Sequence, residues 1–477
     1  MRPQLVFVSG NFNVLHPGHL RLLRFAKECG ERLLVGVSSD RLAGRAAHVP
    51  EALRLEGVQS NSWVDEAFLL DESPAAAIRR LRPDIVVKGK EHEGKRNVEE
   101  AATRSYGGQL IFSSGEVIYS SVDLLRREFE SQEKTAAFLP TEYLRRHHIT
   151  SSRLIKLVKK FSALRVMVIG DLIVDEYVTC DPLGMSQEDP TIVVTPIDSK
   201  LFVGGAGIVA AHAAGLGAEV RLLTVSGNDP SHYFAKMALA EYGVVASILI
   251  DRNRPTTLKQ RFRSKGKTLL RVSHLHQAGI NAELQQRLLA AAKRHIKDCD
   301  LLVFSDFNYG CLPRDLVEQL VALGRKHGLV MVADSQSSSQ VGDVSRFQGM
   351  NLVTPTEREA RLATRDHESG LVVLAEKLRQ QAGARNVFLK MGEEGALIHG
   401  VGAHSPHAVT DRVPALNTAP RDVAGAGDSM LIASSMALAS GADIWSAAAL
   451  GALAAAVQVS RVGNTPLLTS ELMMELS

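Results

Sequence analysis

Cysteine is scarce in this chain of 477 residues: it has four, Cys29, Cys180, Cys299 and Cys311. They lie far apart and lack the close paired spacing of metal ligands. No signal peptide is recognisable at the start of the sequence. Together these features predict a protein of the reducing cytoplasm.

The sequence also lacks a large excess of charge of one sign and lacks long apolar runs. The 55 Lys and Arg residues against 52 Asp and Glu residues give a net charge of +3, so no broad basic surface for nucleic acid is predicted. The most apolar segment, residues 447–459, is too short to span a bilayer and is predicted to form a buried helix, with no membrane partner. The remaining composition, 45% hydrophobic and 22% charged, is that of a globular protein of two or three domains.

The first block of the chain has the pattern of a parallel sheet. Apolar strands are predicted at residues 5–8 and 32–37, with a helical pattern between them. This is a βαβ unit, and ligands of open parallel sheets bind at the carboxyl ends of the strands. His16 and His19 fall at such an end, where two imidazoles beside free helix NH groups can bind a triphosphate and stabilise its growing charge. The alternative is an accidental pair of capping or metal-binding histidines.

The string GNFNVLHPGH, residues 10–19, resembles the motif of the HxGH nucleotidyltransferase superfamily, and the resemblance covers the whole first block. It implies transfer of NMP from an NTP to a phosphate with release of pyrophosphate, through positioning and charge stabilisation. The family's usual Asp is Asn13 here. The resemblance implies catalytic roles for His16 and His19, and nucleotide or phosphate contacts for Gly10, Phe12, Gly18, Lys88, Ser120 and Ser121.

The second block alternates apolar strands with helices, which predicts a doubly wound α/β domain with a hairpin between residues 256 and 272. Its central stretch is DVAGAGD, residues 422–428. Gly425 and Gly427 let the backbone turn sharply, and the NH groups that open the next helix form a phosphate cradle. Asp428 is then placed to take a proton from a hydroxyl that attacks phosphate. The alternative is a tight turn that Asp428 only caps.

This second block resembles the ribokinase-family sugar kinases over its full length. It is most similar to the kinase halves of the bifunctional enzymes of ADP-heptose synthesis, through residues 168–175, 185–191, 204–206, 303–306 and 422–428. The resemblance implies that Asp428 is the base and that Gly425, Ala426 and Gly427 form the anion hole. It further implies sugar contacts for Asp171, Asp175, Gly204 and Gly205, a phosphate contact for Lys390, and support of Mg²⁺ through water for Glu359.

Several positions depart from the kinase pattern and leave the identity of the sugar open. Tyr309 stands where heptose kinases carry Lys, and Asp334-Ser-Gln replaces Asp-Pro-Lys. Thr356 and Ile208 each replace an Asn of the family. Simpler roles also remain as alternatives: Asp306 and Asp334 as caps of strand ends, and Asp171 as a turn residue.

The segment 251–271 is strongly basic, with eight Lys and Arg residues against Asp251, and by resemblance it belongs to the β-lid that closes over the sugar. On a hairpin Lys259, Arg261 and Arg263 share one face. We expect Arg261 or Arg263 to hold the distal phosphate of a phosphorylated sugar bidentately. The alternative is a solvated edge whose charges prevent aggregation.

We therefore predict a nucleotidyltransferase domain at residues 1–135, a linker helix within 136–162 and a ribokinase-like domain at 163–477. The predicted enzyme uses ATP and Mg²⁺ to phosphorylate heptose 7-phosphate at O1, and then transfers AMP to heptose 1-phosphate to give ADP-heptose. The alternatives are a CTP-dependent enzyme for another sugar or polyol, and a kinase whose N-terminal domain only binds nucleotide. A sugar phosphate and an NTP are the expected partners. A homodimer is also expected, because the family's lid often pairs between subunits.

Overall fold

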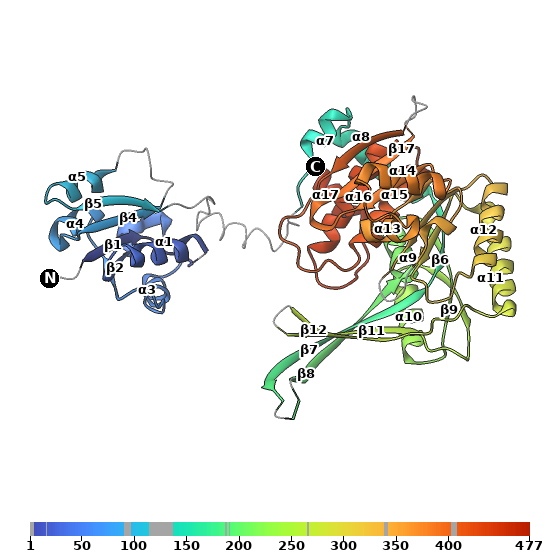
Figure 1. Ribbon diagram of the computed structural model, residues 1–477, viewed down its shortest axis with the longest axis horizontal. Coiled ribbons are helices and arrows are strands. Elements are labelled where there is room, and N and C mark those ends of the chain that lie inside the picture. The colour runs from blue at the N-terminus through green and yellow to red at the C-terminus, as the bar shows by residue number, and fades with distance from the viewer. Residues whose placement is uncertain are drawn as a thin grey trace. The chain divides into compact units, whose positions relative to one another are not determined.

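The chain divides into two compact units, Met1–Lys134 and Thr135–Ser477, in the computed structural model (Figure 1). The structure describes residues 4–15, 17–89, 97–113, 137–186, 188–189, 191–264, 267–337, 342–401 and 408–477. Each unit contains its own doubly wound sheet. Among the described helices, none has the length and apolar character that crossing a membrane requires.

The first unit is a parallel sheet with the strand order β3-β2-β1-β4-β5. Successive side chains of a strand face opposite sides, so Val6 and Val8 pack in one apolar cluster while Phe7 packs in another. Its strands are β1 (Leu5–Gly10), β2 (Arg32–Ser38), β3 (Glu66–Leu70), β4 (Ile85–Gly89) and β5 (Gln109–Ser113). Its helices are α1 (Pro17–Glu28), α2 (Asp40–Ala43), η1 (Gly44–Ala46), α3 (Glu51–Gln59), α4 (Pro74–Leu81) and α5 (Val98–Arg104).

The second unit is built on a larger sheet with the order β10-β9-β6-β13-β14-β15-β16-β17-β18. Its pairs are parallel from β10 to β16 and antiparallel from β16 to β18. The strands are β6 (Arg165–Gly170), β9 (Glu219–Ser226), β10 (Val245–Ile250), β13 (Leu301–Asp306), β14 (Val330–Ser335), β15 (Leu352–Val353), β16 (Asn386–Lys390), β17 (Ala396–Val401) and β18 (Ala408–Val413).

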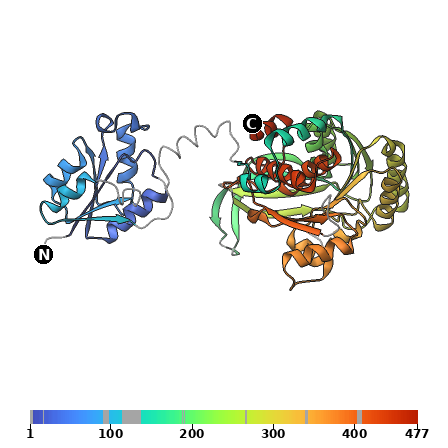
Figure 2. The same ribbon diagram turned by 90° about the horizontal axis from the view of Figure 1, so that it is seen from above.

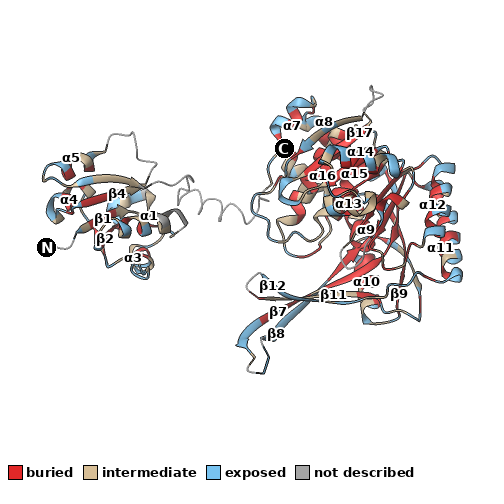
Figure 3. Cartoon of the chain, in the orientation of Figure 1, coloured by how far each residue is buried: buried red, intermediate tan, exposed pale blue. Residues whose placement is uncertain are grey.

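Helices cover both faces of this larger sheet (Figure 2). One face carries α9 (Ala206–Gly215), α10 (Pro230–Glu241), α15 (Ala426–Ala439), α16 (Ile444–Val459) and α17 (Thr469–Leu476). The other carries α11 (Ala282–His295), α12 (Arg314–Lys326), α13 (Glu357–Thr364) and α14 (Leu371–Gln381). Single 3₁₀ turns are η3 (Phe161–Ala163), η4 (Ile296–Asp298), η5 (Val344–Arg346) and η6 (Gly392–Glu394). The predicted buried helix over residues 447–459 is present as most of α16, which is buried along most of its length (Figure 3).

A smaller sheet with the order β12-β11-β7-β8 projects from the second unit and forms the lid. Its strands are β7 (Leu172–Met185), β8 (Ile192–Gly205), β11 (Thr257–Ser264) and β12 (Lys267–His274). The predicted hairpin within 256–272 is confirmed by the antiparallel pairing of β11 with β12. Because β7 follows β6 after one residue and β8 leads directly into α9, the base of the lid lies at the carboxyl edge of the larger sheet.

The segment 136–162, predicted as one linker helix, is described from residue 137 onward and contains two helices, α7 (Thr141–Arg146) and α8 (Ser151–Lys160). Tyr143, Leu154 and Val158 are buried in the same apolar cluster as α16 and α17. Segment 136–162 therefore packs as part of the second unit, since its apolar face needs that core to be covered.

Candidate active sites

The GAGD turn begins helix α15, and its first glycine needs an unusual backbone conformation. Gly425 is the N-cap residue with φ of 78°, in the left-handed region that glycine tolerates best. A Cβ there would also lie 2.4 Å from Asn464 Oδ1. A Cβ on Gly427 would lie 3.1 Å from Lys390 Nζ, so the ammonium of Lys390 sits against the proposed anion hole. Gly425, Ala426, Gly427 and Lys390 are thus brought together.

Asp428 is buried in the first turn of α15, where its Oδ1 accepts a hydrogen bond from Gln336 Nε2 at 3.1 Å. Burial and the neighbouring Asp334 carboxylate raise the pKa of Asp428 to about 7, against the opposing charge of Lys390. Lys390 Nζ donates to Asp334 at 2.9 and 3.1 Å. Although burial disfavours its charge, the Asp334 and Glu359 carboxylates hold the pKa of Lys390 above its ordinary value. A carboxylate that titrates near neutral pH beside a buried cation is suited to general base chemistry.

A second buried carboxylate, Asp175, lies on β7, one of the strands of the lid. Its Oδ2 accepts from Asn464 Nδ2 at 3.3 Å, and its Oδ1 lies 3.5 Å from an Arg261 guanidinium nitrogen. Gly204 pairs with β7 beside it, and a Cβ on Gly204 would lie 2.4 Å from Asp175 Oδ2. Gly205 follows as the N-cap of α9. The structure therefore brings Asp175, Gly204, Gly205 and Arg261 together, as a sugar site requires.

Asp171 has a different environment. Its carboxylate accepts hydrogen bonds from the backbone NH groups of Phe307 (2.8 Å), Tyr309 (3.2 Å) and Cys311 (3.0 Å). Burial and the nearby Asp306 raise its pKa to about 6. Since both oxygens are engaged with the loop after β13, the geometry favours the turn-residue alternative over a direct sugar contact.

Glu359 forms the capping box of α13 with Thr356. Its Oε2 accepts from the backbone NH of Thr356 at 2.7 Å, and its Oε1 accepts from that of Ser337 at 2.9 Å. Within the described part of the chain, no cluster of three or more His, Cys, Asp or Glu side chains could hold a metal ion. A Mg²⁺ ion that arrives with nucleotide fits this site only through water on Glu359, because Mg²⁺ keeps several waters and takes the rest of its ligands from phosphate.

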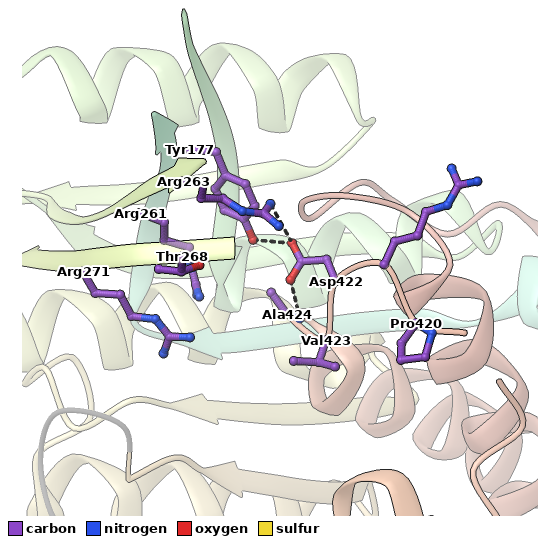
Figure 4. Close-up of a pocket in the computed structure, with 10 residues that line it drawn as sticks. Tyr177, Arg261, Arg263, Thr268, Arg271, Pro420, Asp422, Val423 and Ala424 are labelled. Atoms are coloured by element: carbon purple, nitrogen blue, oxygen red, sulfur yellow. Dashed lines mark hydrogen bonds and ion pairs between the residues drawn. The ribbon is translucent and has the colours of Figure 1, made fainter. Parts of the chain in front are cut away.

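Two hollows lie beside the GAGD turn and Lys390. One, of about 370 Å³, lies between the lid and the GAGD turn (Figure 4), and it is lined by Arg261, Arg263, Arg271, Arg421, Asp422, Tyr177, Thr268, Pro420, Val423 and Ala424. Tyr177 Oη donates to Asp422 at 2.7 Å, and Arg263 lies 3.8 Å from the same oxygen. The other, of about 570 Å³, is lined by Lys390, Gly392, Thr356, Arg358 and Arg361 among others, on the side of α13.

Sequence reasoning missed several residues of this site. Gln336 donates to Asp428, whereas the sequence marks it only as a replacement for Lys. Arg421 and Arg271 line the same hollow as Arg261 and Arg263. Arg271 could have been found from the basic count of the lid, and Arg421 from its place directly before the DVAGAGD stretch.

The first unit gathers part of its predicted site at the carboxyl edge of its sheet. Gly10 ends β1 and Lys88 lies near the end of the adjacent β4. The His19 ring lies 5.0 Å from the Phe12 ring, and its Nδ1 is 3.0 Å from the Val14 carbonyl oxygen. Gly18 lies in the first turn of α1. His16, Ser120 and Ser121 lie outside the described residues.

Lys88 and Asn13 are engaged with neighbouring groups. Lys88 Nζ donates to Glu99 Oε1 at 2.8 Å and to Asn97 Oδ1 at 3.2 Å. Asn13 is buried: its Nδ2 donates to the Ala46 carbonyl at 2.7 Å, while its Oδ1 accepts from the His48 NH at 2.9 Å. The amide therefore ties the loop after β1 to residues 46–48.

The same edge is braced by Arg54, whose guanidinium is buried. It donates to the carbonyls of Val49, Asn11 and Ser38, each at 2.7 Å, and to Asp40 Oδ1 at 2.6 Å. One side chain thus joins the loops that follow β1 and β2, which gives Arg54 a structural role at the rim of the site.

Comparison with protein families gives two matches, one for each block. The family described as pfkB family carbohydrate kinase matches residues 163–470, and the family described as cytidylyltransferase-like matches residues 7–156. Bifunctional protein HldE of Desulfatibacillum aliphaticivorans is 31% identical over 323 residues, covering 67% of this chain and 64% of that protein. Bifunctional protein HldE of Bradyrhizobium diazoefficiens is 31% identical over 325 residues, covering 66% and 63%. The chain thus spans somewhat under two thirds of these relatives.

Solved structures share the fold of the second unit. A carbohydrate kinase from Agrobacterium tumefaciens has a TM-score of 0.51 at 20% identity, covering 66% of this chain and 97% of that one. Ribokinase from Thermotoga maritima has a TM-score of 0.51 at 20% identity, covering 66% and 99%. The predicted fold, a nucleotidyltransferase-like domain followed by a ribokinase-like domain, is confirmed. Through the match over residues 163–470, the chain belongs to the pfkB family of carbohydrate kinases.

Proposed function

We propose that this chain is a bifunctional enzyme of nucleotide-sugar synthesis, with an ATP-dependent sugar kinase in the second unit and a nucleotidyltransferase in the first. The observation that carries the kinase proposal is Asp428: it is buried at the start of α15, next to Lys390, with a pKa of about 7. A carboxylate in this state can accept a proton at neutral pH while the adjacent helix NH groups hold phosphate.

In the proposed kinase reaction, Asp175 and the Gly204-Gly205 backbone hold the sugar, and the reacting hydroxyl faces Asp428. Asp428 takes the proton as the hydroxyl oxygen bonds to the terminal phosphorus of ATP. The bond between that phosphorus and the bridging oxygen breaks, and ADP leaves. The Gly425–Gly427 backbone and Lys390 stabilise the charge on the transferred group. Mg²⁺, when bound with ATP, adds positive charge at the phosphates, and Glu359 would hold it through water.

The proposed kinase substrate already carries a phosphate. Four arginines line the hollow between the lid and the GAGD turn, against one carboxylate, Asp422. Arg261 Nε is buried and has no hydrogen-bond partner among the described residues, so it can still donate to a ligand. Guanidinium groups bind phosphate bidentately, which supports a sugar with a distal phosphate. Heptose 7-phosphate, phosphorylated at O1, is the substrate we propose, from the likeness to the enzymes of ADP-heptose synthesis.

In the first unit we propose transfer of AMP from ATP to the resulting heptose 1-phosphate, with release of pyrophosphate. A phosphate oxygen of the sugar attacks the α-phosphorus, and His16, His19 and Lys88 stabilise the charge that develops. The engaged state of Asn13 favours a second candidate, in which the first unit binds nucleotide without catalysis, because the family's carboxylate is absent and the amide already serves the fold.

We also propose that the chain forms a homodimer through its lid. The outer halves of β7 and β8 expose Leu183, Met185, Ile192 and Ile197. Apolar side chains grouped on an exposed sheet are typical of a surface that pairs with a partner. Size-exclusion chromatography with light scattering of the wild-type chain and of an Ile192→Lys, Ile197→Lys variant tests this, since a dimer through the lid should become monomeric.

The decisive test of the enzymatic proposal is incubation with ATP or CTP and a panel of sugars and sugar phosphates, followed by mass spectrometry. We expect a doubly phosphorylated heptose with ATP, and then ADP-heptose and pyrophosphate. A product only with CTP, or only with another sugar or polyol, would replace the substrate assignment. A bisphosphate without any nucleotide sugar would favour a binding role for the first unit.

A further inference from the structure

The lid places a lysine in the kinase site that neither the motifs nor the proposed mechanism uses. Lys259 lies on β11 directly opposite Asp175 of β7 in the parallel ladder. Its ammonium lies 4.9 Å from the ring centre of Phe307 and 5.0 Å from that of Tyr309. At these distances an aromatic face attracts a cation and fixes its position. Lys259 is therefore half-buried and held between the lid and the loop after β13.

The rings of Phe307 and Tyr309 form an aromatic shelf under Lys259, and this shelf is held in place. The backbone NH groups of Phe307 and Tyr309 donate to the Asp171 carboxylate, so the loop that carries both rings is anchored to the end of β6. Asp171 thus acts on the site through this loop. A cation on a rigid shelf keeps its place when the substrate binds, which is what charge stabilisation in a reaction requires.

The ammonium of Lys259 acts on both carboxylates of the proposed site. Burial raises the pKa of Asp175 and of Asp428, and in each case the charge of Lys259 opposes the rise. The charged groups that act on Asp428 come from four strands: Asp334 of β14, Lys390 of β16, Asp175 of β7 and Lys259 of β11. Lys390 is already paired with Asp334, so Lys259 is the cation that the lid adds to this set.

We propose that Lys259 is a catalytic residue of the kinase, whose ammonium contacts the attacking sugar oxygen and the phosphoryl group as the bond between them forms. This proposal rests on the kinase function proposed above. Lys259 keeps its protons throughout: the hydroxyl proton goes to Asp428, the electron pair of the broken P–O bond goes to ADP, and Lys259 donates hydrogen bonds to oxygens that gain negative charge.

The test compares three variants in the full-length protein: Lys259→Met, which removes the charge at similar size, Lys259→Arg, which keeps it, and Lys267→Met. Lys267 is an exposed residue of the same hairpin and serves as the matched control. We expect Lys259→Met to lower kcat about 10²-fold or more, the loss typical for one transition-state donor. KM for ATP should change little, Lys259→Arg should recover much of the loss, and Lys267→Met should resemble wild type.

A pH profile separates catalysis from a merely structural role. Removing a nearby positive charge disfavours ionisation of Asp428, so the acid limb of the kcat profile should move to higher pH in Lys259→Met and stay in place in Lys267→Met. If wild type is active and Lys259→Met retains kcat within about threefold, or loses activity without moving the limb, the role of Lys259 is refuted while the kinase proposal stands. If wild type phosphorylates no member of the panel, the kinase proposal itself fails.

Discussion

The two units hold the polar groups of their sites in opposite ways. In the second unit, Asp428 is buried with a neutral amide donor, and its pKa is raised to about 7. In the first unit, the corresponding polar groups are engaged in the fold: Asn13 uses both amide atoms to hold residues 46–48, and Lys88 is paired with Glu99. Shifted pKa values are common at functional sites, because burial and like charges bring the pKa of a group to the value that its reaction requires.

This difference indicates which contacts must change in each unit before its proposed reaction can take place. In the second unit the proposed base, Asp428, has a pKa of about 7, so it can ionise at neutral pH without exchanging its partners. In the first unit, the proposed phosphate contact of Lys88 requires that its ion pair with Glu99 be shared or released. The predictions below test this difference between the two units, in order from the largest expected effect on activity to the smallest.

The largest effect is expected for Asp428→Asn. The Gly425–Gly427 backbone is unchanged, so ATP binding should stay nearly intact, while phosphoryl transfer should fall by about 10²–10⁴-fold, as for the loss of a general base. Isothermal titration with ATP and initial rates with the sugar phosphate measure the two separately. Near wild-type turnover in this variant would remove Asp428 from the mechanism.

The wild-type pH profile follows from the same residue. Asp428 must be ionised to accept a proton, and burial raises its pKa to about 7. The kinase kcat should therefore fall as the pH drops below about 7 and reach a plateau above it. An acid limb near pH 4 would mean that the base is exposed to water or is another group.

The next effect tests whether the two sites are independent. His16→Ala should lower NMP transfer by about 10²–10³-fold, because one donor to the developing charge is lost. Kinase activity should remain at the wild-type level, since the GAGD turn belongs to the other unit. A coupled phosphate-release assay for pyrophosphate, run beside a kinase assay, measures both. Loss of both activities in a folded protein would indicate one composite site.

A smaller and more selective effect is expected from the lid arginines. Replacing Arg261 and Arg263 with Gln should raise KM for a sugar phosphate by about tenfold or more, which corresponds to losing about 1.4 kcal/mol of binding. KM for the unphosphorylated sugar should change far less. Arg252→Gln, at an exposed turn just before the lid strands, is the matched control. An equal rise in KM for both substrates would mean that Arg261 and Arg263 do not bind the distal phosphate.

Much of the fold could be predicted because local patterns determine it. Short apolar runs predicted the strands, and the DVAGAGD stretch before an Ala-rich run predicted α15 with Asp428 in its first turn. The place of segment 136–162 could not be predicted, because Leu154 and Val158 are buried against α16 and α17, some 300 residues later in the chain. Amphipathic spacing shows that a helix has an apolar face but not which core covers that face.

The place of a candidate site residue could be predicted where a motif names it, but its contacts could not be predicted where distant loops supply them. Asp171 has the position of a sugar ligand in sequence, yet its carboxylate accepts hydrogen bonds from the NH groups of Phe307, Tyr309 and Cys311. Gln336 contacts Asp428 although the two residues are 92 positions apart in the sequence, and no local pattern predicts this contact. Lys259 was recognised only as part of a basic hairpin, because its aromatic shelf comes from the loop after β13.

The smallest effect on activity is expected from restoring the family's carboxylate with Asn13→Asp, which should act on stability instead. The amide donates to the Ala46 carbonyl, and a carboxylate cannot donate there, so a buried acceptor would face another acceptor. We expect the first unit to lose about 1–3 kcal/mol of stability. Asn61→Asp is the matched control, because Asn61 Oδ1 only accepts from the Trp63 NH, a bond that a carboxylate keeps. Asn61→Asp should be nearly neutral.

Tryptophan fluorescence can report this unit alone, since the chain has two Trp residues, Trp63 and Trp445, one in each unit. In a Trp445→Phe background, urea unfolding followed at Trp63 should give a lower midpoint for Asn13→Asp than for Asn61→Asp. NMP transfer, measured in the same proteins at a temperature where both are folded, should not increase in Asn13→Asp. An unchanged midpoint together with faster transfer would show that this position serves the chemistry and that its amide is dispensable to the fold.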